Sequence, residues 1–284
     1  MKRRLYLSAS LLLTSTALAQ TSTTPVAGLV EQPCPPPMPI PPVLAEARKA
    51  QFDSTKTMPG AEIFSAPGVR EFITATAKRS ETDWANLCRY RDENSSLALD
   101  SAPQVVFIGD SITENWGYAD PEFFGPRVVG RGVSGQTSQQ ILARFYQDVV
   151  ALHPSAVHIL AGTNDVAGNL GPSREQDVLN NIAAMADIAR ANHIHVIIGS
   201  ILPAADFPWR RGLDPAGKIG SLNARLKLLA RQSGALFIDY HETLAGPAGG
   251  MRDGLSTDGV HPNHAGYRVM RALAEAALKH AKPR

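Results

Sequence analysis

The stretch that decides the fold is Val105-Val106-Phe107-Ile108-Gly109-Asp110-Ser111-Ile112-Thr113-Glu114-Asn115-Trp116. Its first four residues are apolar and mostly β-branched, the composition of a strand that is buried on both faces of a parallel sheet. The run ends at Gly109, and polar residues follow at once. Ligands of open α/β sheets bind beyond the carboxyl ends of the strands. The hydroxyl of Ser111 is therefore a candidate nucleophile.

The same residues also have a purely structural interpretation. Ser111 and Glu114 have the spacing of a capping box, in which the Ser oxygen accepts a backbone N–H three residues on and the Glu reaches back. Turns from strand to helix often begin with Ser, Thr or Asp. Taken alone, the stretch favours a helix cap. The choice between a cap and a nucleophile at Ser111 therefore depends on the rest of the chain.

Apolar runs and helical periods alternate after this turn. Such alternation predicts an α/β fold with a parallel sheet that is covered by helices on both faces, and we expect the strand order 2-1-3-4-5. The further strands are expected at residues 127–129, 157–160, 195–200 and 235–239, and the helices at 138–150, 173–192, 216–232 and 263–279.

The residues before the first strand form three segments. Residues 1–19 combine a cationic start, an apolar stretch and a small-x-small site, which predicts a secretory signal peptide rather than a membrane span. Residues 20–42 are rich in Thr and Pro and predict an extended linker. Residues 43–100 predict a helical extension that packs on the main domain, residues 101–284. Its helices are expected at 43–52 and 69–94.

Composition limits the class of protein. The chain has 284 residues, of which 44% are hydrophobic and 19% charged, and this suits one globular domain with extensions. The formal net charge of +2 includes three cations of the predicted signal peptide, so a nucleic-acid partner is not expected. We expect an exported protein, periplasmic or extracellular, without stable membrane insertion. The choice between the Sec and twin-arginine routes and the oligomeric state are left open.

Two cysteines, Cys34 and Cys88, are present in this chain. A disulfide between them would close a loop of about 54 residues, which contributes on the order of 4 kcal/mol in the chain-entropy model. Two separate thiols fit the sequence equally well, so their pairing is left open.

A glycine-rich segment, Gly130-Arg131-Gly132-Val133-Ser134-Gly135, follows the second predicted strand. It matches the dinucleotide fingerprint G-x-G-x-x-G, which belongs on the first strand of such a fold. We therefore expect no nucleotide, and no other cofactor. The glycines instead offer backbone N–H groups that approach a ligand closely.

Asn164 follows the third predicted strand, within Gly162-Thr163-Asn164-Asp165. It lies at the same rim of the sheet as Ser111. One interpretation is an Asx turn that begins a loop. The other is an amide that donates to a developing oxyanion beside the N–H groups of Gly132 and Ser111.

A carboxylate and an imidazole precede the last predicted helix, in Asp258-Gly259-Val260-His261-Pro262. On one loop, Asp258 can accept from one ring nitrogen of His261 while the other faces a nucleophile. An ordinary turn with a surface His is the alternative. Close His pairs occur at 193/195 and 261/264, but neither has the pattern of a zinc site, so we expect no metal.

In their order along the chain, these motifs resemble the GDSL, or SGNH, hydrolase family. The resemblance covers roughly residues 105–274, and its motifs as a set are highly specific. It implies a three-layer α/β/α, flavodoxin-like fold with a five-stranded parallel sheet, and ester hydrolysis through an acyl-enzyme. It also implies the following roles: Ser111 as nucleophile, His261 as base, Asp258 as its orienter, and Ser111, Gly132 and Asn164 as the oxyanion hole. One departure is Gly130, where the family often has Asn.

The substrate is the least determined property. Members of this family remove acetyl groups from carbohydrates, or cleave lipids or thioesters. Trp116, Trp209 and Arg210 lie on predicted rim loops and suit the faces and hydroxyls of sugars, although core packing explains aromatic residues as often. We expect a carbohydrate acetylesterase. The alternatives are a lipase, lysophospholipase or thioesterase, and, from another class, a non-catalytic glycan-binding protein.

Overall fold

The computed structural model describes residues 28–53, 55–56, 60–100 and 102–280. The predicted signal peptide and residues 20–27 of the predicted linker lie outside these ranges. The chain divides into two compact units, Met1–Pro35 and Pro36–Arg284. All the helices and strands described below belong to the second unit.

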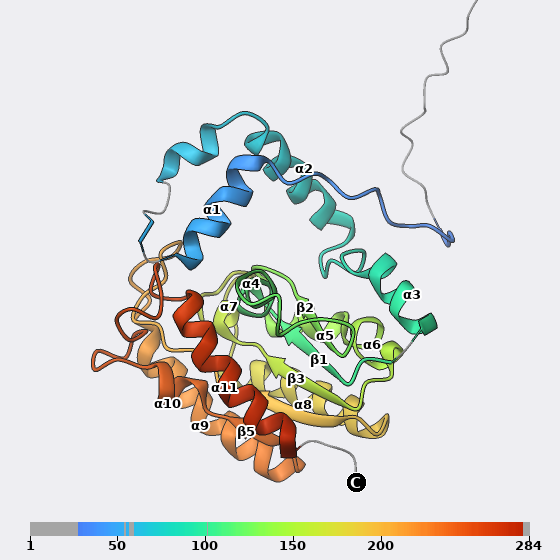
Figure 1. Ribbon diagram of the computed structural model, residues 1–284, viewed down its shortest axis with the longest axis vertical. Helices are drawn as coiled ribbons and strands as arrows, with labels where there is room; N and C mark the ends of the chain where they lie inside the picture. Colours follow the sequence, from blue (N-terminus) through green and yellow to red (C-terminus); the bar gives the residue numbers. More distant parts are fainter. Residues whose placement is uncertain (1–27, 54, 57–59, 101, 281–284) are drawn as a thin grey trace, which may run out of the picture. The chain divides into compact units, whose positions relative to one another are not determined.

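A five-stranded sheet forms the centre of this unit (Figure 1). Its strands lie in the order β2-β1-β3-β4-β5, and every neighbouring pair is parallel. This confirms the predicted α/β class and strand order. The strands are β1 (Val105–Gly109), β2 (Val128–Gly132), β3 (Ala156–Leu160), β4 (His195–Gly199) and β5 (Leu236–Ile238).

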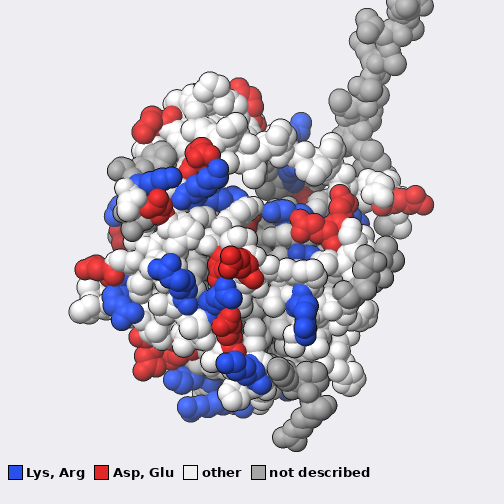
Figure 2. All heavy atoms as spheres, viewed as in Figure 1, with Lys and Arg blue, Asp and Glu red and all other residues white. Residues whose placement is uncertain are grey.

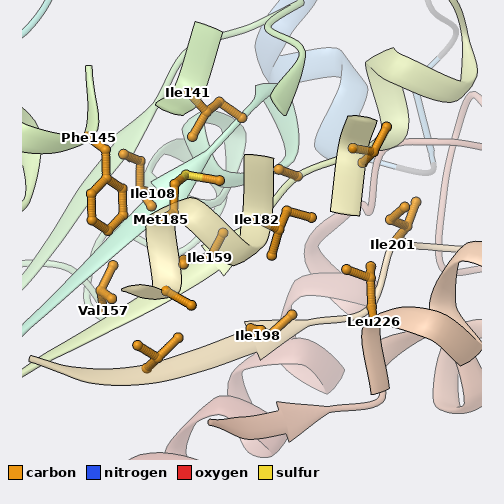
Figure 3. Close-up of a cluster of buried hydrophobic side chains, with 14 of the residues drawn as sticks. Ile108, Ile141, Phe145, Val157, Ile159, Ile182, Met185, Ile198, Ile201 and Leu226 are labelled. Carbon is orange, nitrogen blue, oxygen red and sulfur yellow. The ribbon is translucent and has the colours of Figure 1, made fainter. Parts of the chain in front are cut away.

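Side chains alternate between the two faces of the sheet, and each face has its own layer of helices. Val106 and Ile108 of β1 pack on one side, where Figure 3 shows Ile108 together with Ile182 and Met185 of the covering helices. That layer consists of α5 (Ser138–Ala143), α6 (Phe145–Asp148), α8 (Glu175–Ala191) and α9 (Pro215–Ser233).

The second face carries Val105 and Phe107 of β1. Its layer consists of α4 (Ser111–Ala119), α10 (Tyr240–Leu244) and α11 (His264–His280). All five residues of β1 are buried, because both faces of the central strand are covered. This explains the continuous apolar run, since each large apolar side chain that is buried contributes about 1.5–3 kcal/mol. The three-layer α/β/α architecture is thereby confirmed.

Before the sheet, the chain forms α1 (Pro42–Phe52), the 3₁₀ helix η1 (Ala61–Ser65), α2 (Val69–Thr82) and α3 (Arg91–Asp100). The single helix predicted at 69–94 is wrong. Asp83 ends α2, and its carboxylate accepts the backbone N–H groups of Leu87 and Cys88, which holds a turn in place of a helix. The helix predicted at 138–150 is likewise divided, into α5, α6 and the 3₁₀ helix η2 (Val150–Leu152).

The described residues also settle three smaller points. Neither Cys34 nor Cys88 is a free thiol. Among the described helices, none combines the length and the apolar character that a membrane crossing requires. On the face drawn in Figure 2, acidic and basic side chains are intermixed rather than gathered by sign.

Candidate active site

Ser111 stands at the first turn of α4, immediately after β1. The helix is capped by Asp110, whose Oδ1 accepts the backbone N–H of Ile112 at 2.9 Å. The Ser111 Oγ is therefore not needed as a cap, and it lies 2.9 Å from Nε2 of His261. Glu114 does not reach back either, because its carboxylate accepts the backbone N–H and the hydroxyl of Ser134. The capping-box interpretation of Ser111 is wrong.

Asp258 holds the other side of the His261 ring. Its Oδ2 lies 2.7 Å from Nδ1 of His261. Its Oδ1 accepts the backbone N–H groups of Val260 at 2.9 Å and His261 at 2.8 Å, so the same carboxylate also folds the loop. Burial alone would raise the pKa of Asp258, but the hydrogen bond and charge of His261 hold that pKa below its ordinary value. Asp258 is therefore an anion when it faces the imidazole.

The structure thus brings Ser111 together with two side chains from a distant part of the chain. Ser111 comes from the end of β1, while Asp258 and His261 come from the loop before α11. The side chains of His261 and Asp258 are 13% and 20% exposed, so their contact is largely shielded, and Ser111 is half-buried. A hydroxyl, an imidazole and a carboxylate in this order are the arrangement that can activate a hydroxyl oxygen as a nucleophile.

Asn164 lies in the short helix α7 (Thr163–Val166), at the end of β3, and is buried. Its Nδ2 donates to the carbonyl of Gln136 at 2.9 Å and, more weakly, to Oδ2 of Asp110 at 3.3 Å. Its Oδ1 accepts from Nδ2 of Asn169 at 2.7 Å. These contacts fix the orientation of the amide, with its N–H groups directed toward the rim that carries Asp110 and Ser111.

Asp110 is a second buried carboxyl group in this site. It is 1% exposed, and burial raises its pKa to about 6. Its neighbour Asp165 also has a raised pKa because it is buried, while its carboxylate accepts the N–H and the hydroxyl of Ser138. The two carboxylates hold the starts of α4 and α5, and neither contacts the Ser111 hydroxyl in the described structure.

Gly132 ends β2 and pairs with Gly109 of β1. A Cβ at this position would lie 2.1 Å from the backbone N of Glu114, so only glycine lets β2 approach α4 this closely. Its carbonyl accepts the hydroxyl of Tyr90, which comes from the N-terminal extension. Gly135, with a φ of +80°, turns the chain three residues further on, and its carbonyl accepts from Asn169. This turn therefore lies beside Asn164.

The three predicted substrate contacts lie in different environments. The prediction for Trp116 is wrong, because its ring is completely buried between Phe123 and Tyr267 in the core. Trp209 is 44% exposed, and its ring centroid lies 6.0 Å from that of His261. Arg210 is exposed next to it and donates to the carbonyl of Gly168 at 2.7 Å.

Asn169 was not predicted from the sequence, and it connects two parts of the site. Its Oδ1 accepts the indole N–H of Trp209 at 3.1 Å, while its Nδ2 holds Asn164. No motif marks this residue. No group of three or more His, Cys, Asp or Glu side chains that could hold a metal occurs in the part of the chain that the structure describes.

Comparisons with known proteins agree with the fold described above. Residues 107–269 match the model of the "GDSL-like Lipase/Acylhydrolase family". A solved structure of a GDSL-like lipase from Bacteroides thetaiotaomicron is 45% identical, with a TM-score of 0.67, and the match covers 70% of this chain and 99% of that one.

Two further relatives are more distant in sequence. An acetylxylan esterase from Geobacillus stearothermophilus is 29% identical over 64% of this chain and 95% of its own length. The platelet-activating factor acetylhydrolase IB subunit alpha1 of Bos taurus is 28% identical over 63% of this chain and 77% of its own length.

Proposed function

The chain belongs to the GDSL-like lipase/acylhydrolase family and is a carboxylic ester hydrolase, and we propose that it removes acetyl groups from carbohydrate through an acyl-enzyme on Ser111. The observation that carries the chemistry is the continuous chain of contacts from Ser111 Oγ through His261 to Asp258, at 2.9 and 2.7 Å. A base within hydrogen-bond reach of the hydroxyl is what an activated serine requires.

The proposed reaction has two halves. In the first, Ser111 Oγ attacks the ester carbonyl carbon, its proton passes to Nε2 of His261, and the alcohol leaves with that proton. In the second, His261 takes a proton from water, the resulting hydroxide attacks the acyl-enzyme, and the acid leaves as Ser111 regains its proton. Asp258 keeps the Nδ1 proton of the ring in place, so that Nε2 accepts and donates throughout.

Both halves pass through a tetrahedral intermediate with a negatively charged oxygen. The proposed donors to this oxygen are the backbone N–H groups of Ser111 and Gly132 and the side-chain amide of Asn164. The 3.3 Å bond from Asn164 to Asp110 is the weaker of its two donations, and it is the one that an oxyanion can replace.

The proposed acyl group follows from what the relatives share. The names of the bacterial esterase and of the bovine acetylhydrolase both specify acetyl, although the alcohols differ. The proposed alcohol is a sugar hydroxyl, as in the acetylxylan esterase. It is supported by the exposed indole of Trp209 beside His261, because an aromatic face of this kind stacks on the apolar face of a sugar ring.

The test is a comparison of substrates with purified full-length protein. Acetyl, butyryl and longer p-nitrophenyl esters, assayed beside acetylated xylan and acetylated peptidoglycan, separate the alternatives. Release of acetate from one of the polymers, with activity falling as the acyl chain lengthens, supports the proposal. A preference for long acyl chains would identify a lipase or lysophospholipase instead. Tight binding of the polymers without hydrolysis of any ester would identify a glycan-binding protein.

We also propose export, on the basis of the pattern in residues 1–19 alone. Mass spectrometry of the protein from the culture medium or periplasm of an expressing bacterium tests this directly. A mature chain that begins at Gln20 supports export, and a chain in the cytoplasm that retains residues 1–19 contradicts it.

A further inference from the structure

The carboxyl end of α1 is fixed against the loop that carries Asp258. Phe52 is buried, and its ring packs 6.2 Å from that of Tyr267 and 5.8 Å from that of His264, both on α11. The hydroxyl of Thr257 donates to the backbone carbonyl of Gln51 at 2.7 Å. Figure 1 shows α1 (blue) reaching the loops next to α11 (red). The position of Gln51 is therefore set by the hydrogen bond to its own carbonyl and by the packing of the next residue.

The side chain of Gln51 bridges two elements of the active site. Its Nε2 donates to Oδ2 of Asp258 at 3.2 Å, and its Oε1 accepts from Nδ2 of Asn115, on α4, at 3.4 Å. Oδ2 is the same oxygen that faces the His261 ring. It accordingly has two partners, one from the catalytic loop and one from the N-terminal extension.

We propose that Gln51 is a positioning residue for catalysis, which acts through Asp258 and makes the N-terminal extension part of the active site. Residue 51 lies well before the segment that matches the family model, residues 107–269, so the extension adds this contact to the family's domain. The inference rests on the proposed role of Asp258. As the second donor to Oδ2, Gln51 holds the Asp258 carboxylate in the plane in which it meets Nδ1 of His261.

The charge of the side chain matters as well as its hydrogen bond. A neutral amide beside Asp258 adds no charge to the site, whereas a carboxylate there would favour the protonated imidazole. Asp110, at the end of β1, and Tyr267, on α11, also interact electrostatically with the pair, and both are retained in the variants below. Gln51→Glu should therefore move the acid limb of the pH profile of kcat/KM to higher pH.

The experiment compares Gln51→Leu and Gln51→Glu in the full chain, with p-nitrophenyl acetate as substrate. Lys49→Ala is the matched control, because Lys49 is on the same helix and its side chain is 68% exposed. We expect Gln51→Leu to lower kcat about ten-fold with little change in KM, the size of a lost hydrogen bond to a charged group. We expect Gln51→Glu to move the acid limb upward by about half to one pH unit.

The outcomes separate this inference from the proposed function. If both Gln51 variants keep kcat within about two-fold and leave the acid limb in place, while Ser111→Ala is inactive, Gln51 has no positioning role and the proposed chemistry stands. If Ser111→Ala keeps its activity, the triad and this inference both fail. Thermal melting shows whether Gln51→Leu is folded. Should it unfold, the nearly isosteric Gln51→Glu decides the matter through its pH profile.

Discussion

Oγ of Ser111 and Nε2 of His261 lie 2.9 Å apart, although 150 positions separate the two residues in the chain. The end of β1 fixes the serine, and the loop before α11 fixes the histidine. Neither residue has a structural task that explains this contact, since Asp110 caps α4 and Asn263 accepts the N–H groups of the first turn of α11. The proximity is therefore the strongest evidence for the proposed mechanism.

The first prediction concerns Ser111→Ala. Because Asp110 provides the cap, loss of the Ser111 hydroxyl should leave the melting temperature nearly unchanged, while turnover of p-nitrophenyl acetate falls by at least about 10³-fold. Steady-state kinetics and a thermal melt of the same preparation check both halves. Substantial esterase activity in a folded variant would remove Ser111 from the mechanism.

The second prediction concerns Asn164→Ala. An amide that donates mainly to the transition state should lower kcat by roughly 10²- to 10³-fold when it is removed, with little change in KM. Asn169→Ala leaves the amide present but unoriented, because Asn169 holds its Oδ1 at 2.7 Å, so its loss of kcat should be smaller. A raised KM with normal kcat in Asn164→Ala would instead show a substrate contact.

The third prediction concerns Asp258→Asn. The loop needs an acceptor for the N–H groups of Val260 and His261, and the amide oxygen of Asn can take that place. Its NH₂ group then faces Nδ1 and favours the tautomer in which Nε2 carries the proton, so Nε2 is no longer a base. We expect a loss of about 10³- to 10⁴-fold in kcat, comparable to the same change in a serine protease. Stopped assays in a folded variant measure it, and wild-type activity would show that Asp258 only shapes the turn.

Much of the fold and the main residues of the candidate site could be predicted from the sequence. The parallel α/β fold follows from the alternation of apolar runs and helices, and Ser111, Asn164, Asp258 and His261 stand out because each follows a strand or precedes a helix. The assignment of Trp116 to the substrate site was wrong because the sequence does not distinguish an aromatic residue that faces the rim from one that packs in the core. Only the packing of α4 against the sheet decides that.

The contacts of the N-terminal extension with the site could not be predicted from local sequence patterns. Tyr90 contacts Gly132, and Gln51 contacts Asp258 across 207 positions of the chain. An isolated Gln or Tyr carries no periodicity or spacing that indicates such a partner. The break after Thr82 was missed for a related reason, because the carboxylate of Asp83 competes with the helix for the backbone N–H groups of Leu87 and Cys88.

The fourth prediction concerns stability and pH. Burial raises the pKa of Asp110 from 3.8 to about 6, so between these values the folded protein holds a proton that the unfolded chain has released. The stability this contributes is complete below about pH 3.8 and is lost as the pH rises through 6. Asp110→Asn, which retains a capping oxygen, removes the dependence.

Urea denaturation of both proteins at about pH 4 and about pH 7 tests this. The free energy of unfolding of the wild type, relative to Asp110→Asn, should fall by up to about 3 kcal/mol between the two conditions. Titrating groups that do not interact with Asp110 affect both proteins alike and cancel in the difference. A difference that is the same at both pH values would show that Asp110 stays ionised when it is buried.

The fifth prediction concerns Trp209. Trp209→Ala should raise KM for acetylated xylan oligomers by about five- to ten-fold, the value of one aromatic stacking contact, and leave KM for p-nitrophenyl acetate nearly unchanged. Trp209→Phe keeps an aromatic face but lacks the N–H that reaches Asn169, so it separates stacking from the hydrogen bond. Equal effects of Trp209→Ala on both substrates would argue against a sugar platform.

The central claim is that a single activated hydroxyl, that of Ser111, carries the reaction. The most direct measurement is covalent labelling of the wild-type protein with an alkyl fluorophosphonate, which reacts with activated serine hydroxyls, followed by peptide mass spectrometry. The mechanism predicts one adduct, on Ser111, with esterase activity lost in proportion to labelling and no adduct in Ser111→Ala. Full activity in a completely labelled protein, or an adduct on another residue that accounts for the inactivation, would contradict it.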